Sequence, residues 1–209
     1  MLHAFFLSLL VLCSIPTLEP APPVTKVVFR LIPPDSFSPP ASVAPKTIYV
    51  AGDRYARIEQ PGHADTKNLI IVSEPDIWVV DGEKKQASHM INPGPDLTVH
   101  NPILGPEGPE DLFDFEYGRE LRFFEHVTTK SLGFKEIEGI GCDVHELRSG
   151  DYRIVMNVTR VKNIPHSIQI FLNDRPVLHL QYLGYEKDIP FDPALFRPPD
   201  GIQITESSQ

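Results

Sequence analysis

The stretch Pro190-Phe191-Asp192-Pro193-Ala194-Leu195-Phe196-Arg197-Pro198-Pro199-Asp200-Gly201-Ile202-Gln203-Ile204 closes a long series of alternating segments. Proline has no backbone N–H to give to a strand ladder, so the prolines stop strand pairing here, and Gly201 lets the chain turn into a last short strand. Three large apolar side chains of this stretch can plug an edge of a sheet: Phe191, Leu195 and Phe196. The stretch therefore predicts a mostly β domain that ends in its own closing segment.

Alternation of apolar and polar residues, which is the pattern of a strand, recurs from residue 24 up to this closing stretch. In residues 24–32, for example, Val27, Phe29 and Leu31 fall on one side. Tight turns such as Asp81-Gly82 join neighbouring segments as hairpins. We expect strands over residues 24–32, 47–50, 54–59, 68–73, 77–80, 85–91, 134–137, 142–148, 152–161, 166–172 and 177–185.

A single helix is expected, over residues 110–127. Pro109 suits its first turn and Asp111 its positive end. Apolar side chains cover about half of the helical wheel. They are Leu112, Phe113, Tyr117, Leu121, Phe123, Phe124 and Val127. The fold class that we predict is mainly β (α+β), an antiparallel unclosed β half-barrel covered by this one main α-helix.

Composition limits the kind of partner. With 209 residues and 41% apolar content the chain suits one domain with a sizeable core. Its net charge of −9, with no basic stripe, argues against nucleic acid as a partner. Outside the N-terminal leader only Cys142 remains, so no internal disulfide is expected, and we interpret Cys142 as a small buried residue on a strand.

The N-terminal leader is apolar from residue 5 to residue 15. It is too short to span a bilayer, which takes roughly 20 apolar residues, and Pro16 ends it. We therefore predict a signal peptide over residues 1–22, followed by one domain over 23–209, and a periplasmic or secreted location. An alternative is a lipoprotein that is anchored through an acylated Cys13.

Familiar catalytic and cofactor motifs are absent from the sequence, including Gly-x-Ser-x-Gly, the Walker loop, the dinucleotide glycines and His-Glu-x-x-His. The best zinc candidates are Asp143, His145 and His179, from strands that could be neighbours, but their spacing does not demand a metal. We expect no catalytic residues, no metal and no cofactor.

Two carboxylates fall inside the apolar arc of the expected helix, Glu116 and Glu120. A buried carboxylate has to be paired, protonated or open to a cavity. One reading is a gate or a general acid/base pair that lines a pocket. The other, which we favour, is an ion pair with Arg119, Arg122 or a strand arginine that fastens the helix to the sheet.

The order of these elements resembles the LolA/LolB-like superfamily, the outer-membrane lipoprotein carriers and lipoprotein-sorting-like envelope proteins. The resemblance covers roughly residues 24–204. It is carried by an export leader, by Arg57-Ile58-Glu59, by Trp78-Val79-Val80-Asp81-Gly82, by a central helix, and by the closing stretch described above.

What the resemblance implies is a bowl-shaped sheet with an apolar concave face and a helix across its mouth. The implied function is an exported envelope protein, not an enzyme, that binds a lipid or a lipoprotein acyl chain in the bowl. A further envelope protein is a possible partner. Two alternatives stay open: a regulatory or scaffold domain with a filled core, and a small metal-dependent hydrolase.

The expected ligand site lies between the helix and the inner face of the sheet. On the helix it would involve Phe113, Tyr117, Leu121 and Phe124, and on the strands Trp78, Met156 and Ile168. Alternation by itself does not say which strand face turns inward. The helix would be fastened through Glu116, Glu120 and Arg119.

Overall fold

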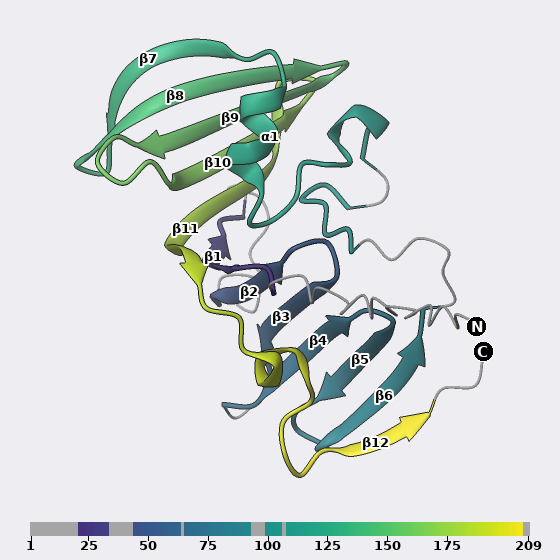
Figure 1. The fold of residues 1–209 in the computed structure, drawn as a ribbon. Coiled ribbons are helices and arrows are strands. Elements are labelled where there is room, and N and C mark those ends of the chain that lie inside the picture. Colours follow the sequence, from purple (N-terminus) through teal and green to yellow (C-terminus); the bar gives the residue numbers. More distant parts are fainter. Residues whose placement is uncertain (1–20, 34–43, 64, 93–98, 106–107, 207–209) are drawn as a thin grey trace, which may run out of the picture.

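The computed structural model describes residues 21–33, 44–63, 65–92, 99–105 and 108–206. They form one sheet with short helical turns (Figure 1). The strands are β1 (Val24–Leu31), β2 (Lys46–Ala51), β3 (Tyr55–Pro61), β4 (Lys67–Ser73), β5 (Asp76–Asp81), β6 (Gln86–Ile91), β7 (Lys130–Ile137), β8 (Ile140–Ser149), β9 (Tyr152–Thr159), β10 (Pro165–Leu172), β11 (Arg175–Ile189) and β12 (Gln203–Glu206). Each expected strand is present, with ends that shift by a few residues.

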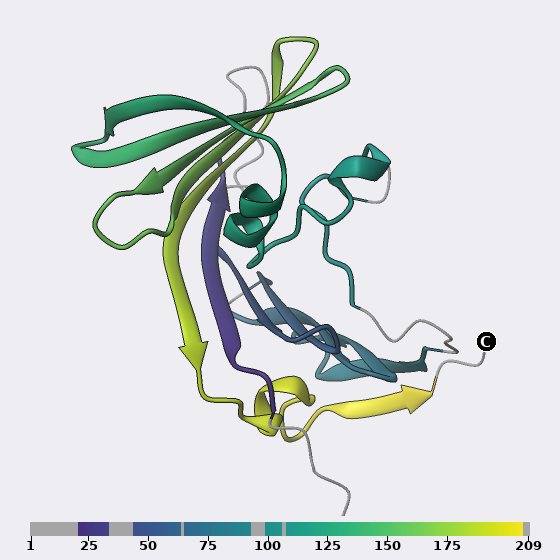
Figure 2. The same ribbon diagram turned by 45° about the horizontal axis from the view of Figure 1, so that its top comes forward.

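The sheet has the order β12-β6-β5-β4-β3-β2-β1-β11-β10-β9-β8-β7. Strands β1–β6 and β7–β11 are two runs of hairpins, joined where β1 pairs with β11. Every pairing is antiparallel except that of β12 with β6, which is parallel. The outer strands β7 and β12 do not pair with each other, so the sheet is curved and unclosed (Figure 2). This confirms the open half-barrel.

Strand alternation gives the sheet two apolar faces. The cluster on the concave face, where α1 (Glu120–His126) lies in Figure 2, includes Val27, Phe29, Ile48, Val50, Met156, Ile168 and Leu180. The cluster on the opposite face is made of Val24, Ala51, Leu69, Ile71, Val80, Ala87 and Phe196. We call these the concave cluster and the outer cluster.

The closing run, residues 190–202, covers the outer cluster. Its short helix η3 (Pro193–Phe196) is capped by the Asp192 side chain, which accepts a hydrogen bond from the Ala194 N–H at 2.9 Å. The Phe196 ring is fully buried, 5.3 Å from the ring of Tyr55. Gly201 has a φ of 79° and leads into β12, as expected. The run thus packs on a face of the sheet rather than plugging an edge, and only β12 adds to an edge.

The single helix expected over residues 110–127 is wrong in extent. The structure has a 3-10 turn, η2 (Glu110–Leu112), and the seven-residue α1. Between them the backbone pairs elsewhere, because Ile103 N–H donates to Phe115 C=O and Tyr117 N–H to Asn101 C=O. Gly118, with a φ of 82°, then turns the chain into α1. A glycine inside a predicted helix was the available warning.

The signal peptide and the acylated Cys13 are expectations about the N-terminal leader. Most of the predicted signal peptide, and Cys13 with it, lies outside the described residues. Within the described part, no helix is both long and apolar enough to cross a bilayer. Cys142 is buried on β8, which confirms its expected place.

Candidate functional site

The connection from β6 to β7 crosses the concave face. We call its described residues, 99–105 and 108–127, the crossing segment; it carries η2 and α1 (Figure 2). Its apolar side chains point into the concave cluster, and the buried ones are Ile103, Leu112, Phe115, Leu121, Phe123 and Phe124. The bowl is therefore filled by side chains of the protein's own connection.

Aromatic rings make up much of this filling. Phe115 is fully buried, with its ring centre 5.1 Å from that of Phe123 and 5.7 Å from that of Phe124. Tyr117 stacks on Phe29 of β1, with ring centres 4.8 Å apart. Ring pairs at such distances add to the gain from burial itself.

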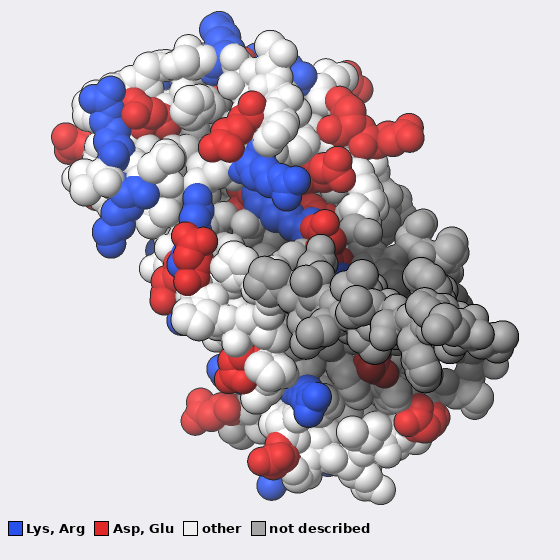
Figure 3. Space-filling model, in the orientation of Figure 1, with Lys and Arg blue, Asp and Glu red and all other residues white. Residues whose placement is uncertain are grey.

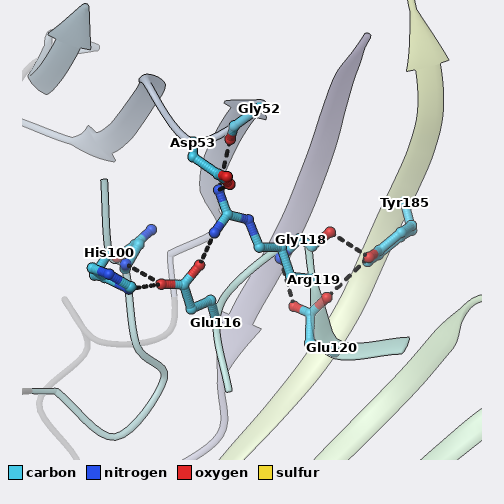
Figure 4. A network of polar contacts seen from close by, with 9 residues as sticks. Gly52, Asp53, His100, Glu116, Gly118, Arg119, Glu120 and Tyr185 are labelled. Carbon is cyan, nitrogen blue, oxygen red and sulfur yellow. Dashed lines mark hydrogen bonds and ion pairs between the residues drawn. The ribbon is translucent and has the colours of Figure 1, made fainter. Parts of the chain in front are cut away.

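Glu116 anchors one side of the crossing segment (Figure 4). Its carboxylate, almost fully buried, accepts hydrogen bonds from His100 Nδ1 at 2.8 Å and from Arg119 at 2.6 Å. The Arg119 guanidinium reaches on to the β2–β3 turn, where it donates to Gly52 C=O at 2.6 Å and contacts Asp53 at 2.9 Å. The predicted fastening named an ion pair of Glu116 with Arg119, and this pair is present, although both residues precede α1 rather than lying on it.

Glu120 anchors the other side through neutral hydrogen-bond donors, and no ion pair joins it to any described residue (Figure 4). It is completely buried and accepts hydrogen bonds from Gly118 N–H at 2.9 Å, from the Tyr182 hydroxyl at 2.8 Å and from the Tyr185 hydroxyl at 2.9 Å. Burial raises the pKa of Glu120, and these hydrogen bonds offset the rise only in part. Burial, together with the charge of Glu120, likewise raises the pKa of both Tyr182 and Tyr185. The Arg119 or Arg122 partner considered for Glu120 is replaced by two tyrosines.

A cavity of about 510 Å³ lies beside α1. Its lining is largely charged and includes Asp53, Asp111, Asp114, Glu116, Arg119 and Arg122. Acidic and basic side chains lie close together over this part of the molecule in Figure 3. Such a lining does not suit an acyl chain, so this opening is not the apolar bowl that was expected.

Five of the seven residues proposed to bind ligand lie together in the concave cluster, namely Tyr117, Leu121, Phe124, Met156 and Ile168. Phe113 lies apart from them because it follows η2 rather than sharing a helix face with Tyr117. Its side chain is 40% exposed, and its ring lies 4.6 Å from that of His100.

Trp78 lies on the other face of the sheet. It pairs with Ile71 of the outer cluster, whereas its neighbour Ile77 pairs with Val72, which packs on the concave cluster. The Trp78 ring stacks on His89 at 5.2 Å. A strand shows a periodicity of two but not which set faces inward, so the sequence could not place Trp78.

The zinc candidates do not converge. His145 pairs with Met156 and so faces the concave side, while His179 pairs with Gln169 on the opposite face. Asp143 forms an ion pair with Arg160 at 2.9 Å. No group of three or more potential ligands was found among the described residues.

Tyr182 and Tyr185 are the site residues that sequence reasoning missed. Three residues apart, they would fall on opposite faces of a regular strand. A bulge in β11 skips one residue, so Tyr182 pairs with Phe29 and Tyr185 with Val27, and both reach the concave side. The sequence offers only a weak hint of this bulge, the glycine at position 184.

No protein-family model and no curated protein matches this chain. Solved structures with a similar fold do exist. An uncharacterized conserved protein from Thermus thermophilus is 11% identical, with 88% of this chain and 91% of that chain covered and a TM-score of 0.49. The Mycobacterium tuberculosis lipoprotein LppX is 11% identical, with 82% and 89% covered and a TM-score of 0.41.

A LolA superfamily protein from Nitrosomonas europaea is 12% identical, with 85% of this chain and 90% of that chain covered and a TM-score of 0.35. None of these three TM-scores reaches 0.5, so the function proposed below rests on the contacts within this chain.

Proposed function

We propose that this chain is a non-enzymatic envelope protein that binds the acyl chain of a lipid or a lipoprotein on the concave face of its sheet. The observation that supports the proposal is the crossing segment. It covers a continuous apolar floor, yet it is not a strand of the sheet. Its described residues make one backbone–backbone hydrogen bond to the strand hairpins, from Val99 N–H to Asp53 C=O at 2.7 Å.

The remaining polar fastening involves side chains, above all those of Glu116, Arg119 and Glu120. Side-chain hydrogen bonds can be exchanged for water when a segment lifts, so the net cost of breaking each is modest, about 1 kcal/mol for neutral pairs and more for charged ones. The crossing segment can therefore act as a lid.

An acyl chain would take the place of the lid's own aromatic side chains. Burial contributes about 0.8 kcal/mol for each CH₂, so a long chain gains on the order of 10 kcal/mol. Lifting the rings of Phe115 and Phe124 gives up a similar apolar contact. The binding is thus an exchange of one apolar filling for another, which suits loading and release.

The packed bowl also favours a second function, that of a regulatory or scaffold domain with a permanently filled core. In that case the crossing segment never lifts, and the apolar side chains beneath it only stabilise the fold. The two functions differ in one measurable property, the uptake of an acyl chain.

The test uses Arg119→Ala, with Arg122→Ala as its matched control. Arg119, at the N-cap of α1, joins Glu116 to the β2–β3 turn, whereas Arg122 lies in the first turn of α1 with no ion pair in the described part of the chain. Losing a charged hydrogen bond costs about 1.5–3 kcal/mol, so the open population of Arg119→Ala should rise about tenfold or more. Stopped-flow uptake of a fluorescent fatty acid should quicken accordingly, with Arg122→Ala unchanged.

Native mass spectrometry of the protein from its own envelope provides the second readout. A bound lipid or acylated protein supports the proposal. A bare mass, together with no fatty-acid uptake by the wild type or by Arg119→Ala, would leave the scaffold function.

A further inference from the structure

Two adjoining cavities lie at the end of the sheet where the β7–β8 and β9–β10 turns meet β11, and neither is lined by a residue of the crossing segment. The first, which we call the turn groove, has a volume of about 500 Å³ and a mostly apolar lining. Its apolar residues include Ile140, Val161, Ile164, Pro165 and Leu183. The second, the polar pocket, has a volume of about 330 Å³.

The turn groove gathers apolar side chains that water would otherwise surround. Val161 is 95% exposed, Leu183 50% and Ile140 41%. Single exposed apolar residues are normal on a protein surface, whereas apolar residues gathered around one hollow are typical of ligand-binding grooves. Leu183 is there because it is the extra residue of the β11 bulge, which sends Tyr182 and Tyr185 inward.

The polar pocket lies on the face of β8–β11 opposite the lid. Its residues alternate with those of the concave cluster, since Asn157 follows Met156 and Ser167 precedes Ile168. The turn between β7 and β8 reaches over it, because Glu138 in that turn accepts a hydrogen bond from Gln181 of β11 at 2.6 Å.

Buried polar groups are concentrated in this pocket. Four of the eight buried polar or charged residues in the described chain line it, namely Asn157, His166, Ser167 and Gln181. Asn157 Nδ2 donates a hydrogen bond to Ser167 Oγ at 2.7 Å. Beside them, the side chains of Gln169 and His179 have no hydrogen-bond partner within the described residues, so both can serve a ligand. Burial lowers the pKa of His179, which favours its neutral ring, able to donate and to accept.

The two cavities adjoin, because His166 lines both. Around them lie three cations, Lys135, Arg160 and Lys162, and one carboxylate, Glu138. Arg160 is paired with Asp143, while Lys135 and Lys162 have no ion pair in the part of the chain that the structure describes. On a chain of net charge −9, this is a local excess of positive charge.

We propose that the turn groove and the polar pocket together bind one single-chain anionic amphiphile, with its hydrocarbon chain in the groove and its acidic head at the pocket. The apolar lining accepts the chain, and the free amide, imidazole and ammonium groups match a carboxylate or phosphate head. The site has no residue of the crossing segment in its lining, although Tyr182 and Tyr185, whose hydroxyls bind Glu120, also line the turn groove.

The experiment titrates laurate, kept below its micelle concentration, into the full chain by calorimetry. Leu183→Asp places a carboxylate in the apolar lining and beside the anionic head, so affinity should fall about tenfold or more. Val161→Asp, at an exposed turn where folding is not at risk, should act in the same direction. Val177→Asp is the matched control, since Val177 is 43% exposed on the same strand but does not line the groove. It should leave the affinity unchanged.

Replacing laurate by neutral monolaurin tests the head, and weaker binding of monolaurin is expected. Equal laurate affinity in wild type, Leu183→Asp and Val161→Asp would overturn the inference, as would binding to anionic vesicles without any binding of monomeric laurate. The proposed lid is tested separately from the groove. If Leu183→Asp loses laurate affinity while Arg119→Ala and Arg122→Ala take up fatty acid at the same rate, the groove is supported and the result counts against the lid.

Discussion

The two faces of the sheet are each covered by a segment that connects or follows strands, and each has a buried carboxylate close to it. On the outer face, Glu59 is bound by Arg57 and by Lys67, both at 2.7 Å, and Arg57 also donates to Leu195 C=O in the closing run. On the concave face, Glu120 accepts hydrogen bonds from the Gly118 N–H and from the hydroxyls of Tyr182 and Tyr185, with no cation among its partners in the described residues.

The two carboxylates respond to burial in opposite ways. For Glu59, burial by itself would raise the pKa, but the hydrogen bonds from Lys67 and Arg57 outweigh it and hold the pKa below its ordinary value. For Glu120, burial dominates and the pKa is raised. Glu59 has two cationic partners and is less deeply buried than Glu120, and both differences favour the charged form of Glu59.

This contrast suggests different roles for the two covers. The closing run is anchored by a charged pair, prolines and a fully buried ring, which suits a permanent cover. The crossing segment is held mainly by side-chain contacts, namely the ion pairs of Arg119 with Glu116 and Asp53 and the hydrogen bonds of Glu120 with two tyrosines, which suits the proposed lid.

The largest expected effect comes from removing a ring on each face. Phe196→Ala and Phe124→Ala each truncate a buried phenylalanine and should each lower the free energy of unfolding by about 3–5 kcal/mol. Urea denaturation measures this loss. Only Phe124→Ala should also change fatty-acid uptake. A change in uptake with Phe196→Ala, or none with Phe124→Ala, would break the distinction between lid and permanent cover.

The next largest loss of stability is expected from replacing one of two glycines by alanine. Gly118 of the crossing segment and Gly201 of the closing run have φ angles of 82° and 79°, a region unfavourable to other residues. A Cβ at Gly118 would lie 2.6 Å from Val50 Cγ2, whereas one at Gly201 meets nothing within 4 Å. Gly201→Ala should therefore cost about 1 kcal/mol from backbone strain alone, and Gly118→Ala about 2–4 kcal/mol.

Thermal unfolding of the two alanine variants checks this order. Equal losses of stability in the two variants would mean that the crossing segment can shift to accommodate the added methyl group. The close contact of Gly118 with Val50 of β2 would then not contribute to stability.

The smallest expected effect is a change in how the free energy of unfolding depends on pH. The folded pKa of Glu120 lies above its unfolded value, so its contribution to stability is complete below the ordinary carboxyl pKa and is lost as pH rises through the raised value. Glu59 has the opposite sign: its contribution is present above the ordinary carboxyl pKa and is lost as pH falls through the lowered value.

Denaturation across a pH series should therefore separate two variants. Glu120→Gln should flatten the loss of stability on the higher-pH side of the carboxyl range, and Glu59→Gln the loss on the acid side. If both variants show the same dependence of the free energy of unfolding on pH as the wild type, neither carboxyl has a different pKa in the folded and unfolded states.

Much of the fold could be predicted from the sequence. The alternation of apolar residues located the strands because one side of each strand is buried, and glycine-containing turns separated the hairpins. Gly201 and the prolines around it correctly marked a turn into a last strand. The ion pair of Glu116 with Arg119 could also be predicted, because the two residues are only three positions apart in the sequence.

The helix and the site were less accessible. The apolar spacing around residues 113–119 predicted a helix, but Phe115 and Tyr117 use their backbone groups to pair with residues 101–103. Trp78 and Met156 are both apolar strand residues, yet they lie on opposite faces.

What the sequence by itself determined is therefore the local pattern: which segments are strands, where they turn, and that the chain closes on its own C-terminal run. The tertiary structure alone decided which face is concave, because alternation has two equivalent settings until the sheet curves. It also decided the partners of Glu120, since a bulge in β11 brings Tyr182 and Tyr185 to it across more than sixty residues of chain. Contacts between distant segments depend on strand register and sheet curvature, and no local pattern in the sequence encodes them.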